Sequence, residues 1–176
     1  YGTFWVDDIQ LEKSGSANSV NVLRNASYSG FTDWAVPSGA TNNAISDNTY
    51  LSQTFNSVGI TGNASDIKTV SQEVTVSGSK GDVFSFGGWG KAKSVSTVSD
   101  FATSMPRTFG ISLSFYNGTT LLKENYIPFN FAIYDWQYIT SMAVAPGNYT
   151  KVVYKYVYDY NCNTAYFAAP YLYKET

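Results

Sequence analysis

Apolar and polar residues alternate with a period of two along most of this sequence, and apolar residues nowhere recur at helical spacing over three turns. The apolar members of three such runs are Val74 and Val76, Phe84 and Phe86, and Phe109, Ile111, Leu113 and Phe115. Successive side chains of a strand point to opposite faces of its sheet. Each run therefore predicts a strand with one face toward a core and the other toward solvent.

Turn-forming residues separate these runs at positions 77–82, 117–119, 145–148 and 161–163. Asn117-Gly118 lies between two alternating stretches and predicts a β-hairpin that begins near Phe109 and ends near Tyr126. Residues 94–106 are rich in Ser and Thr and predict a long loop. Many short strands joined by polar turns indicate an all-β fold, a two-sheet antiparallel β-sandwich.

The chain contains no His, and Cys162 is its single Cys. These counts exclude histidine-dependent catalysis, an intrachain disulfide and the usual zinc sites. The net charge of −2 provides no basic surface for nucleic acid, and no apolar run approaches the ~18 residues of a membrane span. We expect neither a nucleic-acid partner nor a membrane-spanning segment.

Residues 4–13 resemble residues 165–174, at a separation of about one module. We interpret residues 1–13 as the last strand of a preceding similar module, residues 14–19 as a linker, and residues 20–176 as one complete module. Two alternatives stay open. In the first, the match between the two strands is a coincidence. In the second, residues 1–13 pair with an edge of this module's own sheet.

Five motifs in this order resemble those of jelly-roll carbohydrate-binding-like modules. They are residues 21–28 (NVLRNASY) followed by Trp34, 70–78 (VSQEVTVSG), 81–92 (GDVFSFGGWGKA), 135–138 (DWQY), and 163–167 (NTAYF) with 171–175 (YLYKE). The variant with this ending resembles modules that precede the repeats in large secreted RHS-repeat, wall-associated proteins of Gram-positive bacteria. The resemblance implies a jelly roll, a secreted and cell-wall-associated location, and neighbouring modules in the same chain.

The resemblance also implies a function, because the better-studied relatives are non-catalytic modules that bind plant or cell-wall polysaccharides. Many relatives hold a structural calcium ion with a Glu in the opening motif and an Asp in the closing one. This chain has Ser29 and Ala168 at those two positions. Calcium sites are built from several oxygen ligands that usually include carboxylates. We therefore expect no metal and no other cofactor.

Aromatic side chains stack on the apolar faces of sugar rings, while amide, carboxylate and ammonium groups bind the hydroxyls. Trp89 is the first candidate, because it shares a strand side with Gly87 and Lys91, whereas Phe84 and Phe86 share the other side. Its small neighbours leave the indole accessible. The alternative is that Trp89 packs beneath the loop of residues 94–106.

A row of tyrosines along a later strand has two interpretations. Its members are Tyr154, Tyr156, Tyr158 and Tyr160. Facing inward, they form an aromatic core whose hydroxyls need partners; facing outward, they form a stacking surface. We favour the core, and keep Tyr156 and Tyr158 as candidate ligand-binding residues for the outward alternative. The other candidates are Tyr126, Tyr134, Asp135 and Lys91, while Trp34 and Trp136 are expected in the core.

Catalysis is not expected. A glycosidase needs two carboxylates roughly 5–9.5 Å apart across the sugar, and the acidic residues of this chain lie in no motif that requires them. They are Glu73, Asp82, Glu124, Asp135 and Asp159. The leading hypothesis is a non-catalytic module that binds a polysaccharide or cell-wall glycan. The alternative hypothesis is a structural spacer or adhesion domain with no small ligand.

Overall fold

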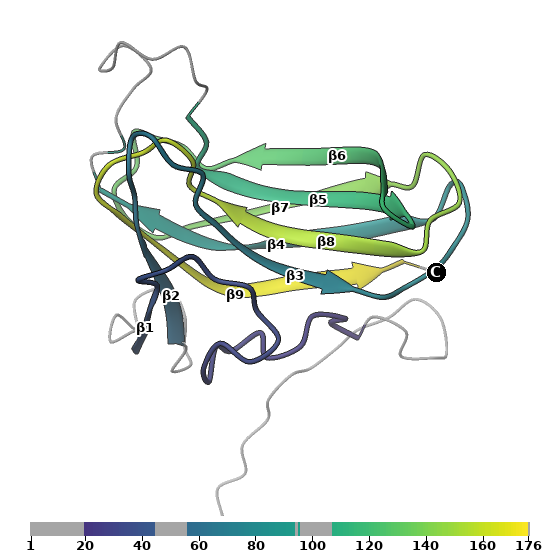
Figure 1. Ribbon diagram of the computed structural model, residues 1–176, viewed down its shortest axis with the longest axis horizontal. Helices are drawn as coiled ribbons and strands as arrows, with labels where there is room; N and C mark the ends of the chain where they lie inside the picture. The colour runs from purple at the N-terminus through teal and green to yellow at the C-terminus, as the bar shows by residue number, and fades with distance from the viewer. Residues whose placement is uncertain (1–19, 45–55, 94, 96–106, 176) are drawn as a thin grey trace, which may run out of the picture.

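The computed structural model describes residues 20–44, 56–93, 95 and 107–175, and within these ranges it contains nine strands and no helix. The strands form two antiparallel sheets that stack face to face, as Figure 1 shows. The predicted β-sandwich is therefore confirmed. Residues 1–19 and almost all of residues 94–106 lie outside the described part of the chain. Neither the preceding strand nor the loop predicted there is described.

One sheet has five strands and the other has four. In spatial order the five-stranded sheet contains β1 (Thr41–Ala44), β2 (Asn56–Thr61), β9 (Thr164–Lys174), β4 (Val83–Ala92) and β7 (Gln137–Val144). The four-stranded sheet contains β3 (Thr69–Val74), β8 (Lys151–Val157), β5 (Gly110–Asn117) and β6 (Thr120–Pro128). No membrane-spanning helix is found among the described residues.

The predicted hairpin is confirmed as β5 and β6, which pair in antiparallel register. Gly118 lies in the turn between them with φ of +59°, a conformation that glycine adopts without a steric cost. The apolar residues of the alternating run are fully buried and face the second sheet: Ile111, Leu113 and Phe115. The period-two pattern thus correctly identifies the inner face of this strand.

The tyrosine row of β8 and the residues just after it faces the core. Tyr154, Tyr156 and Tyr158 are 0% exposed. Their hydroxyls donate hydrogen bonds to backbone carbonyls: Tyr154 to Gly87 (2.8 Å), Tyr156 to Ala168 (2.8 Å) and Tyr158 to Cys162 (2.6 Å). The proposal that Tyr156 and Tyr158 contact a ligand is therefore wrong. The inward alternative is correct, because these carbonyls satisfy the buried hydroxyls.

Trp34 also belongs to the core, as expected. Its side chain is 6% exposed and its ring lies 5.0 Å from the ring of Tyr28 and 6.1 Å from that of Tyr154. The indole N–H donates to the carbonyls of Arg24 and Asn25, each at 3.1 Å. Trp34 therefore fastens the opening segment onto the sandwich.

The buried tyrosines predict a sharp alkaline limit to stability. Burial raises the pKa of Tyr28, Tyr154, Tyr156 and Tyr158 above that of a free tyrosine. In the unfolded chain these groups ionise near pH 10, whereas in the folded chain they stay neutral. Their contribution to stability is complete below about pH 10 and is lost as the pH rises further.

The measurement is a pH titration that follows tyrosinate absorbance together with the far-UV circular dichroism of the sheets. We expect exposed tyrosines to ionise first, and the buried ones to ionise only in step with loss of the strand signal. Complete ionisation of the 15 tyrosines with the strand signal intact would contradict this assignment of the core.

Candidate functional site

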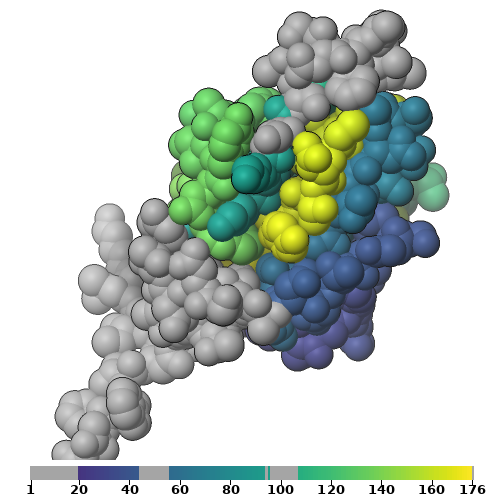
Figure 2. Space-filling view, turned by 90° about the vertical axis from the view of Figure 1, so that its left-hand side faces the viewer, coloured from purple at the N-terminus to yellow at the C-terminus, as the bar shows by residue number. Residues whose placement is uncertain are grey.

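Four aromatic side chains lie together on the outer face of the five-stranded sheet, and we name this group the aromatic platform. Its members are Trp89 of β4, Tyr138 of β7, and Tyr171 and Tyr173 of β9. Ring centroids are separated by 5.3 Å between Trp89 and Tyr138, 6.1 Å between Tyr138 and Tyr171, and 5.2 Å between Tyr171 and Tyr173. Figure 2 shows green β7, teal β4, yellow β9 and blue β2 side by side in this order.

The register of three strands brings these rings together. Trp89 pairs with Tyr138 across β4 and β7, and Gly87 pairs with Tyr171 across β4 and β9. On β4 itself, Phe84 and Phe86 are fully buried whereas Trp89 is only partly buried. The expectation that Trp89 faces away from the phenylalanine side of its strand is therefore confirmed. Whether residues 96–106 pack on it lies outside the described residues.

Gly87 leaves room for the platform. A Cβ atom at this position would overlap the ring of Tyr171 and the carbonyl of Ile139. The Tyr171 ring thus occupies the space above a residue without a side chain and reaches β7, where its hydroxyl shares a hydrogen bond with Thr140. Burial, followed by a hydrogen bond with Tyr171, raises the pKa of Tyr138 and keeps its phenol neutral at physiological pH.

The aromatic platform lies over a bulge in β9. The register of β4 against β9 shifts between Gly87 and Trp89, and Ala169 adopts a left-handed φ of +44°. The hydroxyl of Tyr156 donates to the Ala168 carbonyl at 2.8 Å and accepts the backbone N–H of Trp89. Tyr156 therefore spans the bulge from the core side, directly behind Trp89.

The surroundings of this hydroxyl restrict the sequence of β4. A Cβ atom at Gly88 would overlap the Tyr156 hydroxyl and approach that of Tyr154. Three consecutive residues of β4 thus have distinct roles. Gly87 makes room for Tyr171 on the outer face of the sheet, and Gly88 makes room for Tyr156 on the core face. Trp89 lies on the outer face. Side chains from the core hold the backbone beneath the platform.

Polar groups border the platform at both ends. Near Trp89, the Lys91 ammonium lies 3.1 Å from the Asp135 carboxylate and 6.0 Å from the ring centroid of Trp136. A hydrogen bond from the backbone N–H of Trp136, and then the bond from Lys91, lower the pKa of Asp135. At the other end, the Ser85 hydroxyl bonds to Glu175. The rings thus lie between groups that can bind hydroxyls.

The structure brings some of the predicted residues together and separates others. Trp89, Lys91 and Asp135 meet on one face, and Tyr134 precedes Asp135 in the loop between β6 and β7, where it is 54% exposed. Trp136 is only partly buried, so the expectation that it belongs to the core is wrong. It lies beneath the Lys91 ammonium instead.

Tyr126 lies on β6, in the other sheet. Its ring covers Gly110, and its hydroxyl accepts the backbone N–H of Phe109 at 3.2 Å. Tyr126 therefore lies outside the platform, on the other sheet from Trp89 and Lys91. Tyr138, Tyr171 and Tyr173 were not predicted as site residues from the sequence. Tyr171 and Tyr173 alternate with buried Leu172, which is the signal that places them on one face.

Ion pairs and hydroxyls cover the outer face of the four-stranded sheet. Glu124 accepts hydrogen bonds from Ser112 (2.9 Å), Ser114 (3.2 Å) and Lys155 (3.0 Å). Burial opposes ionisation of Glu124, but these donors outweigh it and lower its pKa. A general acid of a glycosidase needs a raised pKa, so the lowered pKa of Glu124 does not suit that role.

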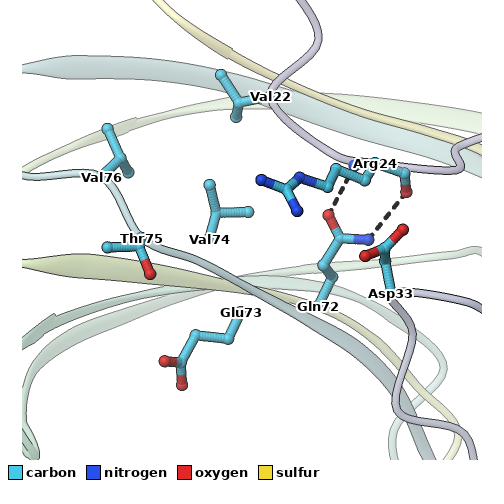
Figure 3. A pocket seen from close by; sticks show the side chains of 8 residues that line it. All are labelled: Val22, Arg24, Asp33, Gln72, Glu73, Val74, Thr75 and Val76. Carbon is cyan, nitrogen blue, oxygen red and sulfur yellow. Dashed lines mark hydrogen bonds between the residues drawn. The ribbon is translucent and has the colours of Figure 1, made fainter.

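A groove of about 450 Å³ runs beside β3, between this strand and the opening segment, as Figure 3 shows. Its lining residues are Val22, Arg24, Asp33, Gln72, Glu73, Val74, Thr75 and Val76. The Gln72 amide accepts the backbone N–H of Arg24 at 2.7 Å and donates to its carbonyl at 2.9 Å, closing one end. No aromatic ring lines this groove, so it offers no stacking surface for a sugar.

No protein-family model and no curated protein sequence matches this chain. Solved structures of similar fold include TmCBM61 in complex with β-1,4-galactotriose (14% identity, TM-score 0.57, covering 89% of this chain and 100% of that chain). They also include the CBM22-1 xylan-binding domain of Paenibacillus barcinonensis Xyn10C (15% identity, TM-score 0.53, covering 91% and 97%). At this identity the likeness shows the fold, which resembles the jelly rolls of carbohydrate-binding modules.

Other structures with this fold are described as enzymes. The enzymatically active domain of bacteriophage CBA120 tailspike protein 4 matches with 11% identity and a TM-score of 0.59. This chain covers 21% of that protein's length, while 88% of this chain is matched. The Stig cyclase Fisc of Fischerella sp. TAU matches with 11% identity and a TM-score of 0.56, over 89% of this chain and 98% of that one. The fold alone therefore does not distinguish binding from catalysis.

Proposed function

We propose that this chain is a non-catalytic carbohydrate-binding module that holds a polysaccharide or cell-wall glycan on the aromatic platform. Trp89 and Tyr138 stack on sugar faces, while polar groups at the border of the platform bind hydroxyls. Lys91, Asp135 and Thr140 are such groups. The glycan lies across β7, β4 and β9, whose outer faces adjoin.

A single observation carries this proposal: the platform is a contiguous set of rings on the outer face of a sheet rather than inside the core. Tyr138 is 49% exposed. Exposed aromatic groups with polar neighbours mark ligand-binding surfaces. This arrangement also favours binding over the alternative of a spacer domain, which needs no such surface.

The non-catalytic part of the proposal rests on the charges around the platform. The Asp135 carboxylate is bonded to Lys91 and to the Trp136 backbone, and the Glu175 carboxylate is bonded to Ser85. Both carboxylates described next to the rings are therefore engaged in bonds to neighbouring groups of the protein. Their chemistry suits binding.

An extracellular, wall-associated setting and neighbouring modules of the same chain are part of the proposal. A flat, solvent-facing sugar site has a modest affinity, and several copies on one chain increase the overall affinity by avidity. The resemblance of residues 4–13 to the closing strand supports a tandem arrangement.

The test is a glycan-array and polysaccharide-retention screen of the chain displayed at high density. We expect retention on at least one neutral plant or cell-wall polysaccharide, and no release of reducing ends from it. Absence of retention on every glycan at high density would contradict the proposal and favour the spacer alternative. Release of reducing ends would indicate an enzyme.

A further inference from the structure

Asn42 and Asn56 meet at one backbone carbonyl where the opening segment reaches the five-stranded sheet. Asn42 Nδ2 donates to the Tyr28 carbonyl oxygen at 2.7 Å, and Asn56 Nδ2 donates to the same oxygen at 3.0 Å. Tyr28 is 0% exposed and has a left-handed φ of +50°, which is uncommon for a residue with a large side chain. A carbonyl oxygen has two acceptor positions, so these two amides saturate it.

The meeting point joins the opening segment to β1 and β2, and β9 lies next to β2. Asn42 belongs to β1, and Asn56 begins β2, opposite Ala44 of β1. The next residue, Ser57, pairs with Ala168 of β9. The amides therefore lie between the neighbourhoods of Ser29 and Ala168, where the sequence resemblance implies calcium in many relatives.

The residues present do not fit a calcium ion. Ser29 donates its hydroxyl to Asn25 Oδ1 at 2.9 Å, and Ala168 has no side-chain oxygen, while its carbonyl accepts the Tyr156 hydroxyl. Calcium binds six to eight oxygen atoms, but here two N–H groups point at the central carbonyl and would repel a cation. The part of the chain that the structure describes contains no group of three His, Cys, Asp or Glu residues that could hold a metal.

We propose that Asn42 and Asn56 form a metal-free clasp: their N–H groups hold the Tyr28 carbonyl in the place where a cation would otherwise tie the first segment to the last strand. Asn21 makes a second clasp of the same kind. Its amide donates to the Pro170 carbonyl and accepts the Leu172 backbone N–H, each at 3.0 Å. The opening segment is thus bound to β2 and β9 by side-chain amides, and the stability of this module is independent of calcium.

The first test is thermal unfolding of the whole chain in EDTA and in millimolar calcium chloride. We expect the same Tm in both. Asn42→Ala and Asn56→Ala should each lower Tm by roughly 2–10 °C, because each removes one of the two hydrogen bonds to the carbonyl of the buried Tyr28. The matched control is Asn43→Ala. Among the described residues, Asn43 Nδ2 bonds only to Thr41, within β1, so its loss should shift Tm by less than about 2 °C.

The second test converts the clasp into a cation site. The double variant Asn42→Asp, Asn56→Asp replaces two donors by two carboxylates that face a carbonyl oxygen, so its Tm should fall in EDTA and rise again with calcium. A wild-type Tm that falls in EDTA would overturn the proposal. So would alanine variants no worse than Asn43→Ala. If the double variant fails to fold, the alanine variants decide.

Discussion

Replacing Trp89 by alanine should lower the affinity for the retained glycan by about 30-fold. Trp89 is the largest ring of the platform, and it sits between Tyr138 and the polar pair of Lys91 and Asp135. Truncating a central aromatic residue of a binding surface commonly costs about 2 kcal/mol or more, which corresponds to about 30-fold in Kd. The measurement is isothermal titration with the glycan, or mobility in a gel that contains the polysaccharide.

The matched control is Tyr126→Ala on the opposite sheet. Tyr126 is 42% exposed, close to the 49% of Tyr138, but it belongs to β6 and not to the platform. We expect Tyr126→Ala to leave glycan affinity within about twofold of wild type. Equal losses in the two variants would place the ligand elsewhere, and an unchanged affinity in Trp89→Ala would contradict a role for the platform.

Replacing Tyr156 by phenylalanine should lower the free energy of unfolding by about 2–4 kcal/mol. The lost hydroxyl leaves the Ala168 carbonyl and the Trp89 backbone N–H without their partner in a fully buried place. Each buried polar group without a partner costs about 1–3 kcal/mol. The change in volume is small, so the effect reports the hydrogen bonds. Urea denaturation gives the value from the shift of the midpoint at constant slope.

Tyr28→Phe is the control for Tyr156→Phe. Tyr28 is equally buried, but its hydroxyl has no hydrogen-bond partner among the described residues. Its removal should therefore leave stability unchanged or raise it. A loss from Tyr28→Phe as large as that from Tyr156→Phe would show that the bulge behind Trp89 does not depend on the Tyr156 hydroxyl.

The alternation of side chains was enough to predict the β-sandwich, the β5–β6 hairpin and the face on which Trp89 stands. These features depend on local patterns: Phe84 and Phe86 identify the inner side of β4, and Asn117-Gly118 identifies a turn. A period of two determines which residues share a side of a strand. It therefore works well wherever one side is clearly more apolar than the other.

The tyrosine strand did not meet that condition. One side carries Tyr154 and Tyr156, the other carries Val153 and Lys155, and either could face a core. What decides between them is the supply of backbone carbonyls on the opposite sheet, at Gly87 and Ala168, which the register of β4 against β9 creates. No local pattern in β8 contains that information.

The sequence predicted only part of the platform, because a local pattern within one strand does not show which strands become its neighbours. Its rings come from β4, β7 and β9, which become neighbours only through the order of strands in the sheet. Tyr126 shows the opposite case. Its residue type suits sugar binding, but its strand, β6, belongs to the other sheet. Residue type identified candidates, and topology selected among them.

The most direct test of the central claim is an NMR titration of the isotope-labelled chain with the glycan that the screen identifies. We expect the largest chemical-shift changes at Trp89, Tyr138 and Tyr171, with further changes at Lys91 and Asp135. Residues on the outer face of the four-stranded sheet, such as Glu124 and Tyr126, should not respond. Shift changes that cluster there, or along the groove beside β3, would contradict the account of the aromatic platform as the binding site.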